Sequence, residues 1–248
     1  ESLCTYCGCN TRITKNHSVE ESYVDTLLKE WSLYLKSFPT KPVVKELHLG
    51  GGTPTFFSSG NLKRLIDGIF KTSIIESDAE LGFEGHPANT SFEHLKTLSE
   101  LGFDRVSFGI QDFDPKVQQL INRKQSFEQV REVVDQARSL GYNSINFDLI
   151  YGLPAQNIES VEFTLEQTLR LRPDRIAFYS YAHVPGIKPA QKSYESFLPD
   201  HLLKQELYTT GKKILLENGY ADIGMDHFAL ESDSLYQSFR KGELHRNF

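Results

Sequence analysis

Two hydrophobic periods alternate along most of the chain, one typical of strands and the other of helices. Short runs rich in β-branched and aromatic residues predict strands at 45–49, 79–85, 104–110, 144–150 and 174–181. Apolar positions three and four residues apart predict helices at 18–38, 59–70, 90–101, 126–140 and 157–171. Strands that alternate with helices indicate right-handed βαβ units and a parallel sheet.

Residues typical of helix ends flank several of these helices. Three polar pairs have the spacing of a capping box, in which two side chains bond free amides at a helix start. The pairs are Ser18 with Glu21, Thr90 with Glu93, and Ser126 with Gln129. Gly102 and Gly141 stand where a left-handed residue ends a helix.

Five strand–helix units favour one large α/β domain over residues 1–248, a partial (β/α)6 TIM-like barrel with a parallel sheet. A sixth strand is expected upstream, and residues 199–248 are expected to lead toward a C-terminal domain. Barrels of this kind carry their chemistry at the carboxyl ends of the strands. Polar or glycine-rich residues follow or end every predicted strand, which places the candidate site there.

Charge and composition argue against several classes of protein. A net charge of -6 argues against a general nucleic-acid binder, which needs a basic stripe. No apolar run approaches the ~20 residues of a membrane-spanning helix, and no signal peptide is visible at the N-terminus, so we expect a cytoplasmic protein without a membrane span. Three cysteines, all near one terminus, disfavour a disulfide framework and favour a reducing compartment.

Those cysteines are Cys4, Cys7 and Cys9. Thiols grouped so tightly in a chain otherwise free of cysteine indicate a soft metal or a cluster, because cysteines used for packing would be scattered. A zinc site formed by the three cysteines and His17 is one alternative, although the usual second pair of ligands is missing.

The stretch Cys4-Thr5-Tyr6-Cys7-Gly8-Cys9-Asn10 resembles the cluster motif of radical S-adenosylmethionine enzymes, and among them of oxygen-independent coproporphyrinogen III oxidases. The similarity continues through residues 48–55, 109–113, 148–154, 181–183, 225–228 and 245–248. Relative to that family, the chain lacks a first cluster cysteine, which would stand just before Glu1, and a domain after Phe248. We therefore expect a fragment that is inactive by itself.

The resemblance implies a 4Fe-4S cluster bound by Cys4, Cys7 and the upstream cysteine, with S-adenosylmethionine on the open iron and Cys9 close by but not a ligand. It also implies the residues that bind S-adenosylmethionine. These are Tyr6 and Ala182 at the adenine, Gly51, Gly52 and Thr53 at the methionine end, Gln111 and Asp148 at the ribose, Arg123 at the methionine carboxylate, and Glu84.

Structural alternatives stay open for these residues: local packing of Tyr6, a flexible glycine turn, and an ion-pair network that closes the barrel. The histidines His183, His227 and His245 are either substrate contacts or core residues. No catalytic side chain is assigned.

The activity implied by the resemblance is oxidative decarboxylation of two propionates of coproporphyrinogen III to vinyl groups, giving protoporphyrinogen IX in haem biosynthesis. A reductant such as flavodoxin or ferredoxin and a monomeric state are expected with it. One alternative is a haem chaperone-type relative that does not decarboxylate, but Gly8-Cys9-Asn10 and His245-Arg246-Asn247-Phe248 favour the oxidase. A zinc-stabilised barrel without redox chemistry is a third possibility.

Overall fold

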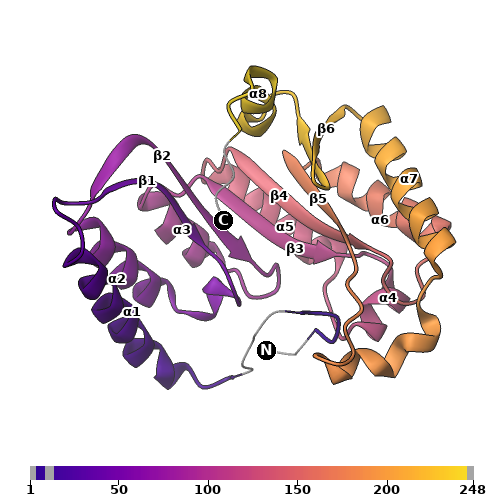
Figure 1. The fold of residues 1–248 in the computed structure, drawn as a ribbon, viewed down its shortest axis with the longest axis horizontal. Helices are drawn as coiled ribbons and strands as arrows, with labels where there is room; N and C mark the ends of the chain where they lie inside the picture. The colour runs from indigo at the N-terminus through magenta and orange to yellow at the C-terminus, as the bar shows by residue number, and fades with distance from the viewer. Residues whose placement is uncertain (1–3, 9–13, 245–248) are drawn as a thin grey trace.

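A curved seven-stranded sheet forms the centre of the protein, in a computed structural model that describes residues 4–8 and 14–244 (Figure 1). The strand order is β1-β2-β3-β4-β5-β7-β6. The first five strands pair in parallel: β1 (Val43–Leu49), β2 (Ile74–Gly85), β3 (Arg105–Gln111), β4 (Ser144–Tyr151) and β5 (Arg175–Ser180). Then β6 (Tyr220–Gly224) and β7 (His227–Leu230) form an antiparallel hairpin, and β7 pairs with β5.

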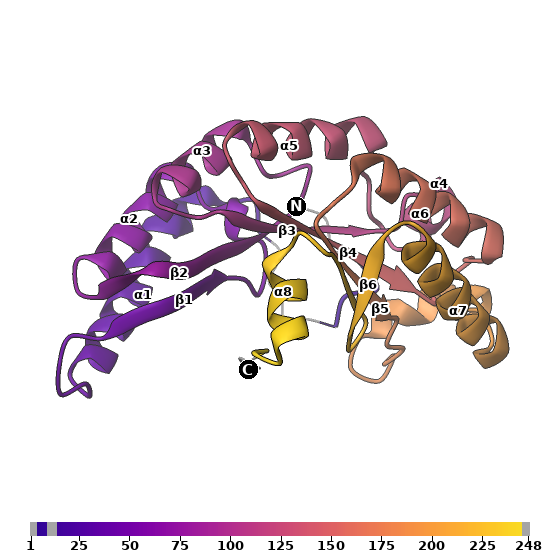
Figure 2. The ribbon, with the colours of Figure 1, turned by 90° about the horizontal axis from the view of Figure 1, so that it is seen from above.

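Helices line the outer, convex side of the sheet (Figure 2). They are α1 (Glu20–Leu35), α2 (Ser59–Phe70), α3 (Phe92–Glu100), α4 (Pro115–Leu120), α5 (Phe127–Ser139), α6 (Ile158–Leu171) and α7 (His201–Glu217). A last helix, α8 (Ser234–Lys241), lies at the end of the sheet where the parallel strands begin (Figure 1). Three short 3-10 helices are η1 (His17–Val19), η2 (Pro54–Phe56) and η3 (Pro189–Phe197).

The hydrophobic core fills the space between the sheet and the outer helices. Alternate strand residues point into it, among them the buried Phe83, Phe108, Phe147 and Phe178. Because neighbouring residues of a strand face opposite ways, the residues between them face the concave side. The concave side is therefore where polar strand residues gather.

The predicted fold class is confirmed, with five strand–helix units in parallel order. The helix predicted at 59–70 has the predicted bounds, and the other bounds differ by a few residues at either end. The hairpin β6–β7 was not predicted from the sequence. It continues the same sheet after α7, and the expectation that residues 199–248 lead toward a further domain stays a prediction.

Two of the three predicted capping boxes are wrong. Helix α1 has Val19 at its N-cap without a side-chain bond, because Asn16 caps the preceding turn η1 and accepts from the amide of Ser18. Helix α3 is capped one residue later than predicted, by Ser91 with His94. The box at α5, Ser126 with Gln129, is confirmed, as are the left-handed glycines at 102 and 141.

Helix α8 is docked through one buried carboxylate. Asp233 accepts from the Nε of Arg175 at 2.7 Å and from the hydroxyl of Ser144 at 2.7 Å. Since Arg175 and Ser144 are the first residues of β5 and β4, these contacts tie α8 to the edge where the parallel strands begin.

Across residues 4–8 and 14–244, we find no helix that combines the length and the apolar character needed to cross a membrane.

Gly211 lets α7 approach the sheet, and its replacement should show how tightly the two pack. A Cβ there would lie 2.4 Å from the ring of Phe178. We expect Gly211→Ala to lower the free energy of unfolding by about 1–3 kcal/mol, because the overpacking outweighs the better helix propensity of alanine. Urea denaturation of the apo protein measures the change.

Gly60 in α2 is the matched control, because a Cβ at that position meets nothing within 4 Å. Gly60→Ala should raise the free energy of unfolding by up to about 1 kcal/mol. Equal stability changes of the same sign in both variants would contradict the packing argument.

Candidate functional site

The cysteine loop is docked on the end of α4. The amide of Thr5 donates to the carbonyl of Ile121 at 3.0 Å, and the Thr5 hydroxyl donates to the carbonyl of Leu120 at 3.3 Å. A tight turn joins the two cysteines, since the amide of Cys7 donates to the carbonyl of Cys4 at 3.2 Å. Both thiols are free and half-buried. The loop thus presents two thiols beside the carboxyl ends of the strands.

Arg123 connects this loop to β3. The residue is 5% exposed, and its amide donates to the carbonyl of Gln118 at 2.9 Å in the turn that ends α4. Its guanidinium donates to the Sγ of Cys4 at 3.6 Å, to the carbonyl of Gly109, and to the side chain of Gln125 at 3.2 Å. This one side chain therefore ties the cysteine loop to the end of β3.

Backbone strain marks the end of β3. Gln111 has a φ of 70°, and the amide of Asp112 donates to the carbonyl of Ile110 at 2.9 Å, so Gln111 is the centre of a γ-turn of the rare kind. The register of β3 against β4 shifts between Gly109 and Gln111. A Cβ on Gly109 would lie 2.7 Å from the side-chain Nε2 of Gln111. Buried residues with a strained backbone conformation such as this one are found most often at functional sites.

Asp148 on β4 faces the concave side between two buried apolar neighbours. One carboxylate oxygen accepts from the hydroxyl of Ser107 at 3.1 Å, and the other accepts from the amide of Asn146 at 2.8 Å. Burial raises the pKa of Asp148 in spite of these bonds. A carboxylate held in this way still has lone pairs that can accept from a ligand hydroxyl.

Glu84 on β2 lies next to the glycine loop after β1. Its Oε1 is 3.6 Å from the Nε2 of His48, and both side chains are about half exposed. A Cβ on Gly50 would lie 2.8 Å from the same oxygen, so only glycine permits this approach. The neighbouring carboxylate of Glu84 raises the pKa of His48.

Tyr6 and Ala182 are joined by one buried amide, although they are far apart in sequence. The Nε2 of Gln191 donates to the carbonyl of Tyr6 at 2.9 Å and to that of Ala182 at 3.3 Å. Tyr6 packs against the cluster of Val117, Ile121, Leu153, Tyr181 and Tyr194, and burial raises its pKa. The structure thus places the cysteine loop against the end of β5.

The remaining candidates lie on the loops after β1 and β5. Gly51 has a φ of 98°, and a Cβ on Gly51 or Gly52 would meet nothing within 4 Å, so this backbone is open to a ligand. The half-buried Thr53 precedes η2. His183 bonds to Tyr181 and Glu195, and Cys9 and His245 lie outside the described residues.

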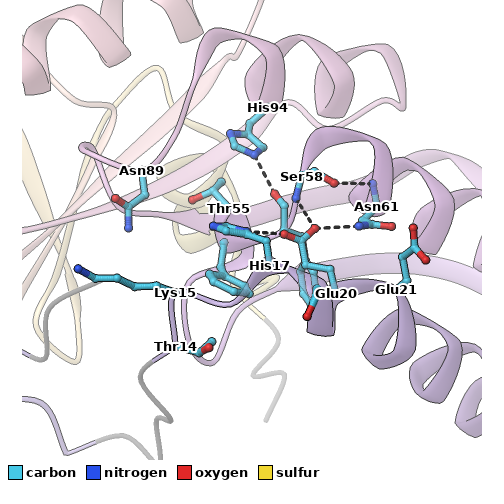
Figure 3. A pocket seen from close by; sticks show the side chains of 13 residues that line it. Thr14, Lys15, His17, Glu20, Glu21, Thr55, Ser58, Asn61, Asn89 and His94 are labelled. Atoms are coloured by element: carbon cyan, nitrogen blue, oxygen red, sulfur yellow. Dashed lines mark hydrogen bonds and ion pairs between the residues drawn. The ribbon is translucent and has the colours of Figure 1, made fainter.

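Within the parts of the chain that the structure describes, no three His, Cys, Asp or Glu side chains stand together as a metal site. His17, the fourth ligand of the zinc alternative, is engaged elsewhere: its Nδ1 lies 2.6 Å from Glu20, and its ring stacks on Phe56. These residues line a cavity of about 900 Å³ between η2 and the starts of α1 and α3 (Figure 3). The zinc alternative therefore gains no support from His17.

The family is decided by a match over most of the chain. Residues 2–168 match the family model described as the radical SAM superfamily. The chain belongs to the radical SAM superfamily. Membership implies a 4Fe-4S cluster and S-adenosylmethionine as cofactors, and it confirms the resemblance found in the sequence.

This radical SAM chain is similar to several proteins named oxygen-independent coproporphyrinogen III oxidase. It is 40% identical to the protein of Synechocystis over 99% of its own length and 53% of the relative's. It is 42% identical to the protein of Helicobacter pylori strain J99 over 100% of its length and 54% of the relative's. The chain spans about half the length of the curated relatives it matches.

Solved structures extend the comparison. Coproporphyrinogen III oxidase from Escherichia coli, described as a radical SAM enzyme, matches with a TM-score of 0.95 and 38% identity over 99% of this chain and 57% of that one. Methylornithine synthase matches with a TM-score of 0.55 and 14% identity over 86% of this chain and 59% of that one, which shows a shared fold only.

Sequence reasoning missed the residues that support the site. Gln125, Gln191, Ser107 and Asn146 each bond to a candidate residue or its backbone. Polar residues in alternation with apolar ones on β3 and β4 were a usable signal for Ser107 and Asn146. Nothing in the sequence singled out Gln191, because its partners are distant in the chain.

The link between His48 and Glu84 can be tested by titration. A negative partner favours the protonated imidazole, so Glu84→Gln should lower the pKa of His48 toward its ordinary value. Proton NMR of the His48 ring over a pH series measures this. Glu46→Gln, on the same strand as His48, should have the smaller effect. An unchanged pKa in Glu84→Gln would show that the pair does not form.

Proposed function

We propose that this chain is the radical SAM core of an oxygen-independent coproporphyrinogen III oxidase. The observation that carries the proposal is the match to the Escherichia coli enzyme over 99% of this chain at a TM-score of 0.95 and 38% identity. Arg123 and Gln191 also tie the cysteine loop to the ends of β3 and β5. We extend this proposal to the two cofactors and to the residues that bind them.

In this proposal, Cys4 and Cys7 supply two of the thiolates for the cluster, and Arg123 holds the loop in place at Cys4. Glycine backbone at 51 and 52 and Thr53 bind the methionine end of S-adenosylmethionine. When bound, the reduced cluster supplies the electron that cleaves S-adenosylmethionine to a 5′-deoxyadenosyl radical. The chain's own residues orient the cofactor, and the open backbone at 51 and 52 leaves room for it.

The remaining cofactor-binding residues each keep a free hydrogen-bonding capacity. The carboxylates of Asp148 and Glu84 can accept from hydroxyl or amino groups, and Arg123 has a planar donor fork. Gln111 is held in its strained turn, and Tyr6 with the carbonyl of Ala182 offers an aromatic ring and an acceptor to the adenine.

In the reaction that follows, a hydrogen atom of a propionate β-carbon passes to the 5′-deoxyadenosyl radical, which becomes 5′-deoxyadenosine. The substrate radical then loses CO2 and gives one electron to a one-electron acceptor, which leaves a vinyl group. Two propionates of coproporphyrinogen III react in this way in the proposed activity. We also propose a small electron donor such as flavodoxin or ferredoxin, a monomeric state and a cytoplasmic location.

Cofactor recognition is tested at Asp148. Asp148→Asn keeps the shape but loses the charge, and hydrogen bonds to a charged group contribute about 1.5–3 kcal/mol. We expect S-adenosylmethionine to bind about 10- to 100-fold more weakly, with unchanged iron content. Calorimetry on anaerobic protein from the whole gene measures the affinity. The matched control is Asp104→Asn, at the opposite end of β3, which should leave the affinity unchanged.

Cluster binding is tested by cysteine replacement in the same protein, reconstituted without oxygen. Cys4→Ala and Cys7→Ala should each abolish the visible iron–sulfur absorption, because three thiolates are needed to hold the cluster. Cys9→Ala should retain it. Equal loss in all three variants would refute the assignment of the ligands.

A further inference from the structure

The side chain of Gln191, on η3, bonds three backbone groups that belong to two distant segments. Its Nε2 donates to the carbonyl of Tyr6 at 2.9 Å and to the carbonyl of Ala182 at 3.3 Å. Its Oε1 accepts from the amide of Val184 at 2.6 Å. Gln191 is 0% exposed, so it can influence a ligand only through these partners. The partners lie in the cysteine loop and in the segment after β5.

The orientation of the Gln191 amide follows from the chemistry of its partners. The carbonyls of Tyr6 and Ala182 can only accept, and the backbone amide of Val184 can only donate. A flipped side chain would set its oxygen against two carbonyl oxygens. Both amide hydrogens of Gln191 are therefore in use, and none is left for a ligand. The carbonyl of Ala182 has a second lone pair, which stays available to a ligand.

Side chains hold the backbone where β5 leaves the sheet. The amide of Tyr181 still donates to the carbonyl of Tyr151 at 2.8 Å, as a strand residue would. The carbonyl of Tyr181 accepts instead from the Nζ of Lys204 on α7 at 2.6 Å, and the carbonyl of Ala182 accepts from Gln191. Gln191 thus does for this segment what a neighbouring strand does inside the sheet.

The short helix η3 is itself fixed in place, so Gln191 is held on a rigid support. Residues three apart share one face of a 3-10 helix, which puts Tyr194 beside Gln191. Tyr194 is buried, and its hydroxyl lies 3.0 Å from the hydroxyl of Tyr181. At the end of η3, the carbonyl of Phe197 accepts from the amide of Ala155 at 2.7 Å. One face of η3 therefore fastens the cysteine loop to the end of β5.

The rest of the proposed site is held by other contacts. Cys4 is bonded by Arg123, and Thr5 is bonded through its amide and its hydroxyl to carbonyls at the end of α4. The glycine loop proposed for the methionine end follows β1, at the other side of the sheet from β5. Loss of the Gln191 bonds should therefore disturb one end of the cofactor site and leave the other end in place.

We propose that Gln191 is a positioning residue, which sets the distance between Tyr6 and the carbonyl of Ala182 and so shapes the adenine end of the S-adenosylmethionine site. The inference rests on the proposed function, which assigns Tyr6 and Ala182 to the adenine. Gln191 does not touch the cofactor. It holds the aromatic ring and the acceptor at the spacing that the adenosyl group needs, and it takes no part in binding the methionine end.

The test uses anaerobic, reconstituted protein from the whole gene, with 5′-deoxyadenosine and methionine as separate probes of the two ends of the site. Gln191→Glu keeps the shape and the acceptor for the Val184 amide but loses the amide donors. Gln191→Met removes all three bonds and adds no charge. In both variants, the Kd of 5′-deoxyadenosine should rise about tenfold, since bonds that fix the pocket are lost. The Kd of methionine should stay within about twofold, and iron content should not change. Calorimetry measures both affinities.

Gln167 on α6 is the matched control, because it is also buried and its side chain accepts from Arg170 at 2.6 Å. Gln167→Glu and Gln167→Met should leave both Kd values within about twofold of the wild type. An unchanged Kd of 5′-deoxyadenosine in the Gln191 variants overturns the inference. Equal weakening of both probes also overturns it, because Gln191 would then support the whole site. Gln191→Met decides alone if the buried carboxyl of Gln191→Glu prevents folding. Vinyl formation from coproporphyrinogen III by the wild type is measured separately, and its absence overturns the proposed function.

Discussion

The buried guanidinium of Arg123 is the contact on which the arrangement of the site depends. It bonds at once to Cys4, to the backbone of Gly109 and to Gln125, which belong to the cysteine loop, to β3 and to the segment before α5. Removing one partner of a buried charge leaves that charge uncompensated, so the three segments are fixed together. The cysteine loop is thus positioned by the same side chain that is proposed to meet the cofactor.

The sheet divides the molecule into an apolar and a polar side. Large side chains such as Phe83 and Phe147 fill the convex side against the helices, while polar ones such as Glu84 and Asp148 face the concave side. Carboxylates can remain on the concave side because each has a partner or access to solvent. Glu84 is paired with His48. Asp148 accepts from the hydroxyl of Ser107 on β3 and from the side-chain amide of Asn146 on its own strand.

Two turns with positive φ stand at the edges of this concave side, one at Gln111 and one at Met225–Asp226. The first ends β3 at the proposed cofactor site, and the second orients His227 through a carbonyl. The first turn positions the side chain of Gln111, and the second positions the carbonyl of Met225.

Much of the fold could be predicted because it depends on local patterns. The five parallel strands and the helices after them follow from hydrophobic period and helix-end residues, as at Ser126 and Gly141. The predicted caps failed at Ser18, where Asn16 caps the preceding turn η1, and at Thr90, where Ser91 caps α3 one residue later. The hairpin β6–β7 escaped prediction because its strands are short and its turn lacks the usual glycine.

By itself the sequence determined the fold class, the family and the ends of the strands at which the candidate residues stand, because period and motif spacing are local properties of a chain. Only the tertiary structure decided which of these residues meet. The bonds from Gln191 to Tyr6 and Ala182, and from Tyr179 to His227, join positions far apart in sequence. Such pairs follow from sheet register and helix packing, which bring distant side chains together and which no local pattern encodes.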